Sequence, residues 1–240
     1  MSQDLLLEIG VEELPASFVA QAIEALPGLL GARLRELRLT HGPLRALGTP
    51  RRLALIVEAV AEAQPDLDEE VLGPPARVAF DADGKPTKAA LSFAAKIGVA
   101  PEALMRKVTD KGEYVAGRRV EQGAPALTLL PGVLSEVCGK IPFRKSMRWS
   151  DGDTAFGRPV RWLLGLFGST ELGFDFAGVH SGHVSYGHRF LSPAPIRIET
   201  PGAYIGVLRR AHVLVDPVER KQTMVARLAD AALTIDGVLI

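Results

Sequence analysis

The sequence predicts an α+β fold with mixed or antiparallel sheets and flanking helices. The short apolar run 5–9, ended by Gly10, has the pattern of a buried strand. Residues 18–37 place apolar side chains at helical spacing, and the runs 44–47 and 53–60 look like two more strands. A strand, a helix and two strands in succession are typical of a layer that mixes sheet and helix.

Two features of this first region carry further expectations. Pro27 and Gly28 should kink or break the helix 18–37, because proline removes a backbone donor. Pro50, Arg51 and Arg52 lie in the turn between the two later strands, where both arginines could reach an anion. The alternative for these two arginines is a salt-bridged pair at the surface.

The stretch 61–75, AEAQPDLDEEVLGPP, is acidic and carries prolines, so it is the best candidate for an internal linker or edge loop. Its acids lack the glycine hinge and the ligand spacing of a calcium loop, so we expect solvated charge there. We therefore expect residues 1–240 to form one α+β region with a possible sub-boundary near 61–75.

Residues 81–90, DADGKPTKAA, invite comparison with a phosphate-binding loop but do not match one. Pro86 separates Lys85 from Thr87, and the two glycines that should bracket four residues are not present. We expect a turn followed by a helix over 88–97 that Thr87 caps. A short helix near 101–105, a strand at 114–120 and a helix over 125–138 follow.

The stretch 143–162, FRKSMRWSDGDTAFGRPVRW, combines five arginines or lysines with two tryptophans and two phenylalanines. Such cations between flat rings could contact the phosphates of RNA and stack on its bases. The alternative is a pair of half-buried strands with the cations in solvent. We expect strands at 145–149 and 158–167, paired antiparallel, with Asp151 and Asp153 in the loop between them.

Three histidines, His180, His183 and His188, follow a strand expected at 174–179 and raise the question of zinc. Nearby acids or thiols are absent from this segment, which favours structural or polar-loop roles. A strand at 196–199, a helix at 201–210 and a strand at 212–215 come next. Asp216 should cap a final helix that begins at Pro217 and runs to 233.

Composition excludes several classes of protein. The chain has 240 residues, 28 lysines and arginines and 28 acids, so no net field attracts nucleic acid and any anion-binding face must be local. A single cysteine, Cys138, excludes intramolecular disulfides and a paired-thiol zinc site. The acidic N-terminus does not resemble a secretory signal and no apolar run could span a bilayer, so we expect a cytoplasmic protein. The apolar ending suggests a piece of something longer.

Eight motifs, in order, resemble the N-terminal portion of the beta subunit of bacterial glycyl-tRNA synthetase. They are LLLEIGVEELP (5–15), TPRRLAL (49–55), FDADGKPTKAA (80–90), VTDKGEY (108–114), KSMRW (145–149), FGRPVRWLL (156–164), GHRFL (187–191) and VDPVERK (215–221).

The resemblance implies part of a glycine–tRNA ligase, an aminoacyl-tRNA synthetase of two alpha and two beta chains. In that family the alpha subunit carries the adenylation site that uses ATP and magnesium, and the beta subunit serves tRNA binding and assembly. The beta chain is roughly three times as long as this one, with an HD-type and an anticodon-binding domain absent here. Its N-terminal region looks like the editing-type domain of the phenylalanyl-tRNA synthetase beta chain, which is analogy of fold and does not establish function.

We therefore expect a non-catalytic module, without a metal or cofactor of its own, that binds glycine tRNA and the alpha subunit. The RNA-binding candidates are the cations and rings of the basic clusters: Arg51, Arg52, Arg144, Lys145, Arg148, Trp149, Arg158, Arg161, His188 and Arg189. Two alternatives stay open. One is a structural domain that docks the alpha subunit, and the other is an editing-like hydrolase for which His183 or His188 would be the base.

Overall fold

The computed structural model describes residues 1–81, 83–149, 152–235 and 237, and the chain divides into two compact units. The large unit comprises Met1–Gln64 and Pro125–Ile240, and the small unit comprises Pro65–Ala124. The small unit is therefore an insertion in the chain of the large one, and the first crossing between units falls within the stretch 61–75.

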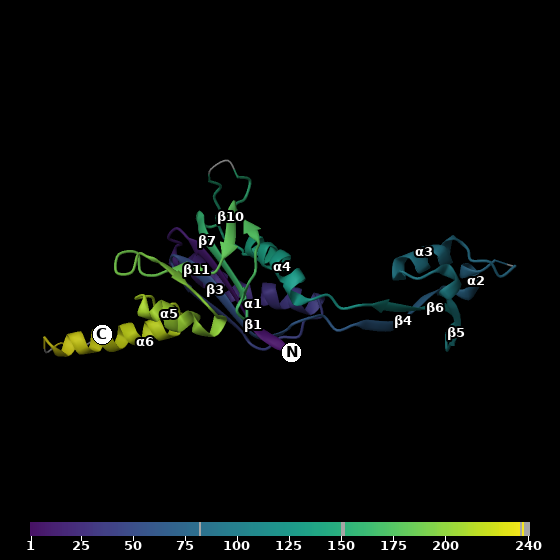
Figure 1. The fold of residues 1–240 in the computed structure, drawn as a ribbon, viewed down its shortest axis with the longest axis horizontal. Helices are drawn as coiled ribbons and strands as arrows, with labels where there is room; N and C mark the ends of the chain where they lie inside the picture. Colours follow the sequence, from purple (N-terminus) through teal and green to yellow (C-terminus); the bar gives the residue numbers. More distant parts are fainter. Residues whose placement is uncertain (82, 150–151, 236, 238–240) are drawn as a thin grey trace. The chain divides into compact units, whose positions relative to one another are not determined.

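The large unit is built on a seven-stranded sheet in the order β2-β3-β1-β7-β10-β9, with β8 paired to β7 (Figure 1). All neighbours are antiparallel except β10 and β7, which are parallel. The strands are β1 (Ser2–Val11), β2 (Leu44–Thr49), β3 (Arg52–Ala61), β7 (Val160–Phe167), β8 (Thr170–Glu171), β9 (Asp175–Phe176) and β10 (Val179–Gly182).

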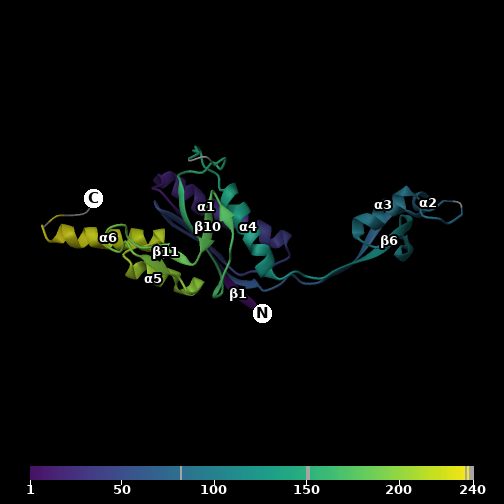
Figure 2. The same ribbon diagram turned by 45° about the horizontal axis from the view of Figure 1, so that its top comes forward.

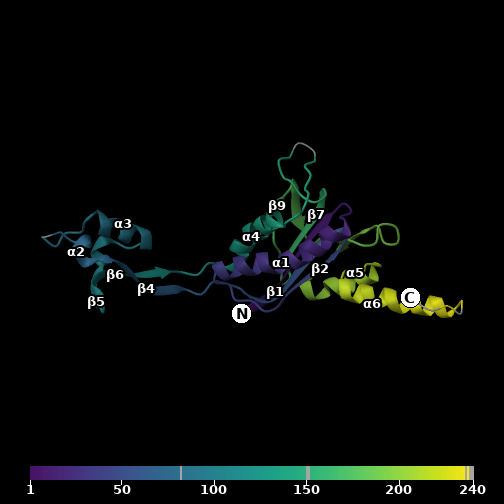
Figure 3. The same cartoon turned by 180° about the vertical axis from the view of Figure 1, so that it is seen from behind.

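The first face of this sheet packs on two helices, α1 (Ala16–Glu36) and α4 (Ala126–Lys140). Figure 3 shows α1 running across the sheet near β1 and β2. Alternate residues of β1, from Leu5 to Val11, point to this face and are buried. Both helices pack apolar stripes against these strand residues, at spacings of three and four residues. On α1 the stripe includes Leu26, Leu30 and Leu34.

The second face is covered by α5 (Tyr204–Arg210), which follows a short 3₁₀ turn at Pro201–Ala203. Leu6, Ala54 and Leu164 come from three neighbouring strands and pack there against Tyr204 and Leu208. A hairpin of β11 (Val184–Tyr186) and β12 (Pro195–Arg197) and the last helix α6 (Pro217–Leu233) complete this side (Figure 2). The sheet is thus buried on both faces, which explains why β1 reads as an almost continuous apolar run.

The small unit is a three-stranded antiparallel sheet in the order β4-β6-β5 with helices against it. Its elements are β4 (Leu67–Pro75), α2 (Ala76–Ala79), α3 (Lys88–Ile97), a 3₁₀ turn at Pro101–Ala103, β5 (Met105–Thr109) and β6 (Gly112–Glu121). A modest core of Ala79, Ala90 and Val115 holds them together.

The predicted α+β class, with mixed and antiparallel sheets, is confirmed. The cap at Asp216 is confirmed as well, because its carboxylate accepts a hydrogen bond from the Val218 backbone N–H at 2.9 Å. None of the helices in the described part of the chain combines the length and the apolar character that crossing a bilayer requires.

Four local predictions are wrong. Helix α1 runs unbroken through Pro27, because its buried stripe continues on both sides of the proline. Much of the expected linker is strand β4, whose acids pair with cations on β5 and β6. Thr87 lies at the predicted N-cap position of α3, but its side chain makes no capping hydrogen bond, since the hydroxyl donates to the Val78 carbonyl at 2.7 Å. The expected strand at 212–215 is irregular chain between α5 and α6.

The expected strand at 145–149 is also wrong within the residues described. The segment makes one isolated bridge, Met147 with Phe156, while β7 pairs with β1, β8 and β10. The aromatic side chains there are taken up by the core instead: Phe143 and Phe156 meet edge to face with ring centres 4.8 Å apart. Asp151 lies outside the described residues.

Candidate functional site

A fully buried carboxylate lies in the middle of the second face of the large sheet. Glu8 of β1 has no exposed surface, and its Oε1 accepts hydrogen bonds from Trp162 Nε1 at 2.9 Å and Ser185 Oγ at 2.9 Å. The Arg52 guanidinium supplies the opposite charge, with Nη1 3.4 Å from the same oxygen. A buried acid needs such partners, because an unpaired charge in the interior is strongly destabilising.

Strand register explains how these side chains meet. Gly10 pairs with Arg52 on β3 and with Trp162 on β7, so the three residues form one row across the sheet. A β-carbon on Gly10 would lie 1.9 Å from the Trp162 ring, so only glycine lets the indole lie over the strand. The Arg52 guanidinium then lies 5.5 Å from the centre of that ring, which adds a cation–π contact.

This geometry corrects the prediction that Arg52 contacts phosphate. Arg52 is 1% exposed, and its Nη2 donates to the Tyr186 carbonyl at 2.6 Å while its Nη1 donates to Ser185 Oγ at 3.2 Å. The Arg52 side chain is therefore buried and cannot reach a phosphate at the surface. Its contacts with Ser185 and Tyr186 anchor the chain where it leaves β11 toward residues 187–192.

The residue before it, Arg51, lines a surface groove together with the segment that Arg52 anchors. The groove has a volume of about 460 Å³ and is bounded by the β2–β3 turn, residues 187–190 and the chain after α5. A second hollow of about 260 Å³ is also lined by Arg51 and Arg189, and Arg161 adds a third guanidinium. We call this surface, defined by Arg51, Arg161, Arg189 and Arg220, the arginine groove.

Backbone hydrogen bonds fix the walls of the arginine groove. The Arg51 carbonyl accepts from the Val11 N–H at 2.9 Å, which ties the β2–β3 turn to the end of β1. On the other side, the His188 N–H donates to the Ala211 carbonyl at 2.9 Å. Gly187 allows this close approach, since a β-carbon there would lie 2.9 Å from the Ala211 β-carbon and 2.7 Å from the Ser192 carbonyl oxygen.

The electrostatics of the groove favour an anion. Burial lowers the pKa of Arg51, and repulsion from the Arg189 and Arg52 guanidinium groups lowers it further. Burial also lowers the pKa of Arg220, whose Nη1 donates to the Leu214 carbonyl at 2.7 Å. Arg51 Nε is buried and has no hydrogen-bond partner among the residues that the structure describes. A bound anion would offset the repulsion between these guanidinium groups.

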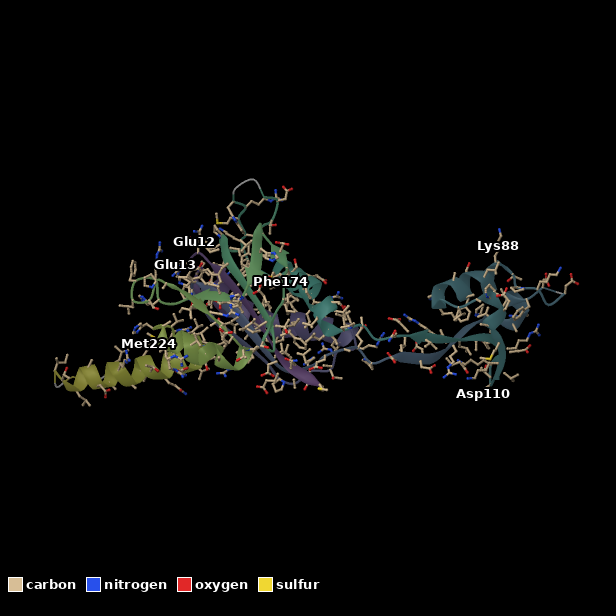
Figure 4. The ribbon with its side chains drawn as sticks, in the orientation of Figure 1. Glu12, Glu13, Lys88, Asp110, Phe174 and Met224 are labelled. Atoms are coloured by element: carbon tan, nitrogen blue, oxygen red, sulfur yellow. The ribbon has the colours of Figure 1, made fainter. Side chains whose placement is uncertain are left out.

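Two acids moderate the charge. Glu12 and Glu13, labelled in Figure 4, lie next to each other where β1 ends, and both work against the lowering of the Arg51 pKa. Glu12 pairs with Arg161 at 3.3 Å, and both side chains are largely exposed. Such an exposed pair contributes about 1 kcal/mol or less and can exchange for a phosphate contact.

The structure brings together some of the predicted RNA-binding residues and separates others. Arg51, Arg161, His188 and Arg189 line the arginine groove. The rest lie on the segment between α4 and β7: Arg144, Lys145, Arg148, Trp149 and Arg158. The three residues Arg144, Lys145 and Arg148 are exposed, whereas Trp149 is half-buried against the core of the first face. Arg158 donates to the Gly157 carbonyl at 2.9 Å.

Sequence reasoning missed Glu8, Arg220 and His212. The signal for Glu8 was present, because a lone acid inside the apolar strand LLLEIGV demands a buried cation. No comparable signal marks Arg220 and His212, which reach the groove only because α5 and α6 fold back beside the sheet.

The three histidines do not form one site. His180 Nδ1 lies 2.9 Å from Asp175, and His183 lies between Glu171 and Arg197. His188 accepts hydrogen bonds from the backbone of its own loop. Within the described ranges, no group of three or more histidine, cysteine or acidic side chains is arranged to hold a metal ion.

Comparisons with known proteins agree on one family. A family model described as the glycyl-tRNA synthetase beta subunit matches residues 5–239. The chain is 48% identical over 232 residues to the glycine–tRNA ligase beta subunit of Myxococcus xanthus, covering 97% of this chain and 33% of that protein. It is 42% identical over 240 residues to the glycine–tRNA ligase beta subunit of Geobacter sulfurreducens, covering 100% of this chain and 35% of that protein. The chain thus spans about a third of the length of these relatives.

Proposed function

The chain belongs to the family of the glycyl-tRNA synthetase beta subunit, and from this premise we propose that its large unit helps a glycine–tRNA ligase to hold its tRNA. The proposed contact surface is the arginine groove. The attachment of glycine, with ATP and magnesium, is assigned to the alpha subunit that the name of the relatives implies. In this scheme the present chain contributes binding and position, and none of its residues takes part in bond making.

One observation carries the proposal: Arg51, Arg161 and Arg189 gather around one hollow in a chain whose formal net charge is zero. Burial lowers the pKa of Arg51, and repulsion from the Arg189 and Arg52 guanidinium groups lowers it further, so the positive charge of Arg51 is held at a cost. A fold keeps such an arrangement at a cost in stability, and a polyanion would offset that cost. Arginine also matches phosphate geometry better than lysine, because its planar fork can donate two parallel hydrogen bonds.

The experiment compares the assembled enzyme carrying Arg189→Ala with the wild-type enzyme in tRNA binding at several salt concentrations. One lost phosphate contact should weaken binding and reduce the slope of log K against log salt by about one unit. Arg35→Ala is the matched control, because Arg35 is exposed on α1 and does not line the groove. Unchanged affinity and slope in Arg189→Ala would refute the groove as a tRNA contact.

The segment between α4 and β7 stays a second part of the proposal. Arg144, Lys145 and Arg148 are exposed there and could extend the RNA path. Arg148→Ala, assayed in the same way, should lower the salt slope only if this segment also meets the RNA backbone.

Assembly is the second candidate function, and helix α6 favours it. This helix of 17 residues has no buried residue, yet it exposes large apolar side chains. Those at least 48% exposed are Val218, Met224, Val225, Leu228 and Leu233, and Figure 4 labels Met224. Apolar stripes of this kind usually mark an interface. We propose the alpha subunit as the partner.

Capture of the alpha subunit tests this second role. Leu228→Glu should reduce capture by roughly tenfold or more, since it places a charge in an apolar contact. Thr223→Glu introduces the same negative charge about 140° around the helix from Leu228, away from the apolar side chains, and should leave capture unchanged. Normal assembly of the Leu228→Glu enzyme would contradict the role of α6.

A further inference from the structure

The loop 187–192, GHRFLS, holds an aromatic ring out into solvent beside the arginine groove. Phe190 is 81% exposed and lines the groove next to Arg189. Single exposed apolar side chains are common on protein surfaces. What distinguishes Phe190 is its place beside the cations of the groove.

The loop is a built turn. His188 Nδ1 accepts hydrogen bonds from the N–H groups of Phe190 at 3.3 Å and Leu191 at 3.2 Å. The Ser192 N–H donates to the His188 carbonyl at 2.9 Å, which closes the turn. The backbone of Phe190 is thus fixed, and little conformational entropy is lost when its ring binds a partner.

The same loop lies against the cations that the groove gathers. Arg189 precedes Phe190 in the chain, and Arg51 of the β2–β3 turn also lines the groove. An aromatic face beside two guanidinium groups offers stacking for a base and hydrogen bonds for the adjoining phosphate. Glu13, also at the groove, can accept a hydrogen bond from a ribose hydroxyl or a base amino group.

We propose that this groove binds one unpaired nucleotide of RNA, whose base stacks on Phe190 and whose phosphate contacts Arg51 and Arg189. The inference rests on the proposed tRNA-binding function and narrows it to a single-stranded part of the RNA. A paired base is excluded as the ligand, because both its faces are covered within the helix stack.

The test uses the assembled enzyme with a short single-stranded oligoadenylate and, in parallel, the same strand annealed to oligouridylate. Phe190→Ala should weaken binding of the single strand by roughly tenfold, in line with the loss of one stacked base, and leave duplex binding unchanged. Phe190→Trp should keep the affinity, and the emission of the introduced tryptophan should be quenched by the single strand alone. The salt slope should stay the same in both Phe190 variants, since no phosphate contact is lost.

Each result other than these is informative. If Arg51→Ala and Arg189→Ala weaken tRNA binding but Phe190→Ala does not, the groove binds phosphates only; the proposed function stands and the nucleotide site is wrong. If Phe190→Ala weakens single strand and duplex alike, the loop has merely lost its shape and stacking is refuted. If Phe190→Ala impairs capture of the alpha subunit but not RNA binding, the ring belongs to a protein interface. If none of the three variants changes RNA binding, both proposals fail.

Discussion

Arg52 and Trp162 lie on the two strands that flank β1, and the guanidinium carbon of Arg52 is 5.5 Å from the centre of the Trp162 ring. Gly10 lies between them in the same row of the sheet. The motifs that carry the family resemblance therefore converge in space: LLLEIGVEELP supplies Glu8 and Gly10, TPRRLAL supplies Arg52, and FGRPVRWLL supplies Trp162. Together these residues form the buried cluster behind the arginine groove.

The contact between Gly10 and Trp162 predicts a severe effect of a single methyl group. Gly10→Ala places a β-carbon 1.9 Å from the indole, which must move and give up its hydrogen bond to Glu8. We expect a loss of about 3 kcal/mol in the free energy of unfolding, measured in urea by tryptophan fluorescence. Gly28→Ala on α1 is the control: no neighbouring atom of the described residues lies within 4 Å of its β-carbon, so a gain of about 0.5–1 kcal/mol is expected. Equal stabilities of the two variants would contradict the packing described.

The buried ion pair predicts the effect of removing one charge. Glu8→Gln keeps the shape of the side chain and an acceptor for Trp162 but leaves the Arg52 guanidinium buried without an opposite charge. The free energy of unfolding should fall by about 3–5 kcal/mol. Because Arg52 anchors the chain ahead of the groove, the fraction that remains folded should also bind tRNA more weakly. A Glu8→Gln chain as stable as wild type would show that the pair is dispensable.

Sequence reasoning placed most elements of the fold and failed where the answer depends on distant residues. The cap at Asp216 and the helix Lys88–Ile97 follow from local chemistry and were predicted with nearly the observed bounds. The segment 145–149 has the residue types of a strand, but whether it pairs depends on what lies beside β7, and β1 and β10 occupy those edges. The first crossing into the small unit falls within the stretch 61–75, where the sequence suggests a boundary, but no comparable signal marks the return crossing between Ala124 and Pro125.

The candidate site shows the same limit. Arg51 and Arg52 are adjacent and looked equivalent in the sequence, yet one lines a groove and the other is buried. Arg51 belongs to the β2–β3 turn and Arg52 begins β3, and the ion pair with Glu8 on the neighbouring strand holds Arg52 inside the protein. The gathering of Arg161 and Arg189 beside Arg51 comes from three separate parts of the chain and could not be predicted from spacing.

Tyr204 predicts a dependence of stability on alkaline pH. Burial raises the pKa of its hydroxyl well above the usual value of 10.0, and the Glu8 carboxylate adds to this rise. The folded state keeps the proton while the unfolded state releases it, so the stabilising contribution is complete below about pH 10 and is lost above it. Near pH 8 the free energy of unfolding of Tyr204→Phe should equal that of wild type to within about 1 kcal/mol. Above pH 10 the wild-type value should fall relative to that of the variant by up to about 1.4 kcal/mol per pH unit.

Urea unfolding of both chains at a series of pH values between about 8 and 11 measures this difference. Burial also raises the pKa of Cys138, but that thiol titrates in both chains, so the comparison isolates Tyr204. Parallel stability curves across the whole range would contradict the burial of the Tyr204 hydroxyl beside Glu8.

The most direct test of the arginine groove is the salt dependence of tRNA binding by the assembled enzyme with Arg51→Ala and Arg189→Ala combined. The expected result is a slope of log K against log salt lower than wild type by about two units, with weaker binding at every salt concentration. A slope equal to that of wild type and of the Arg35→Ala control would contradict the account, because it would show that Arg51 and Arg189 do not contact phosphates of the tRNA.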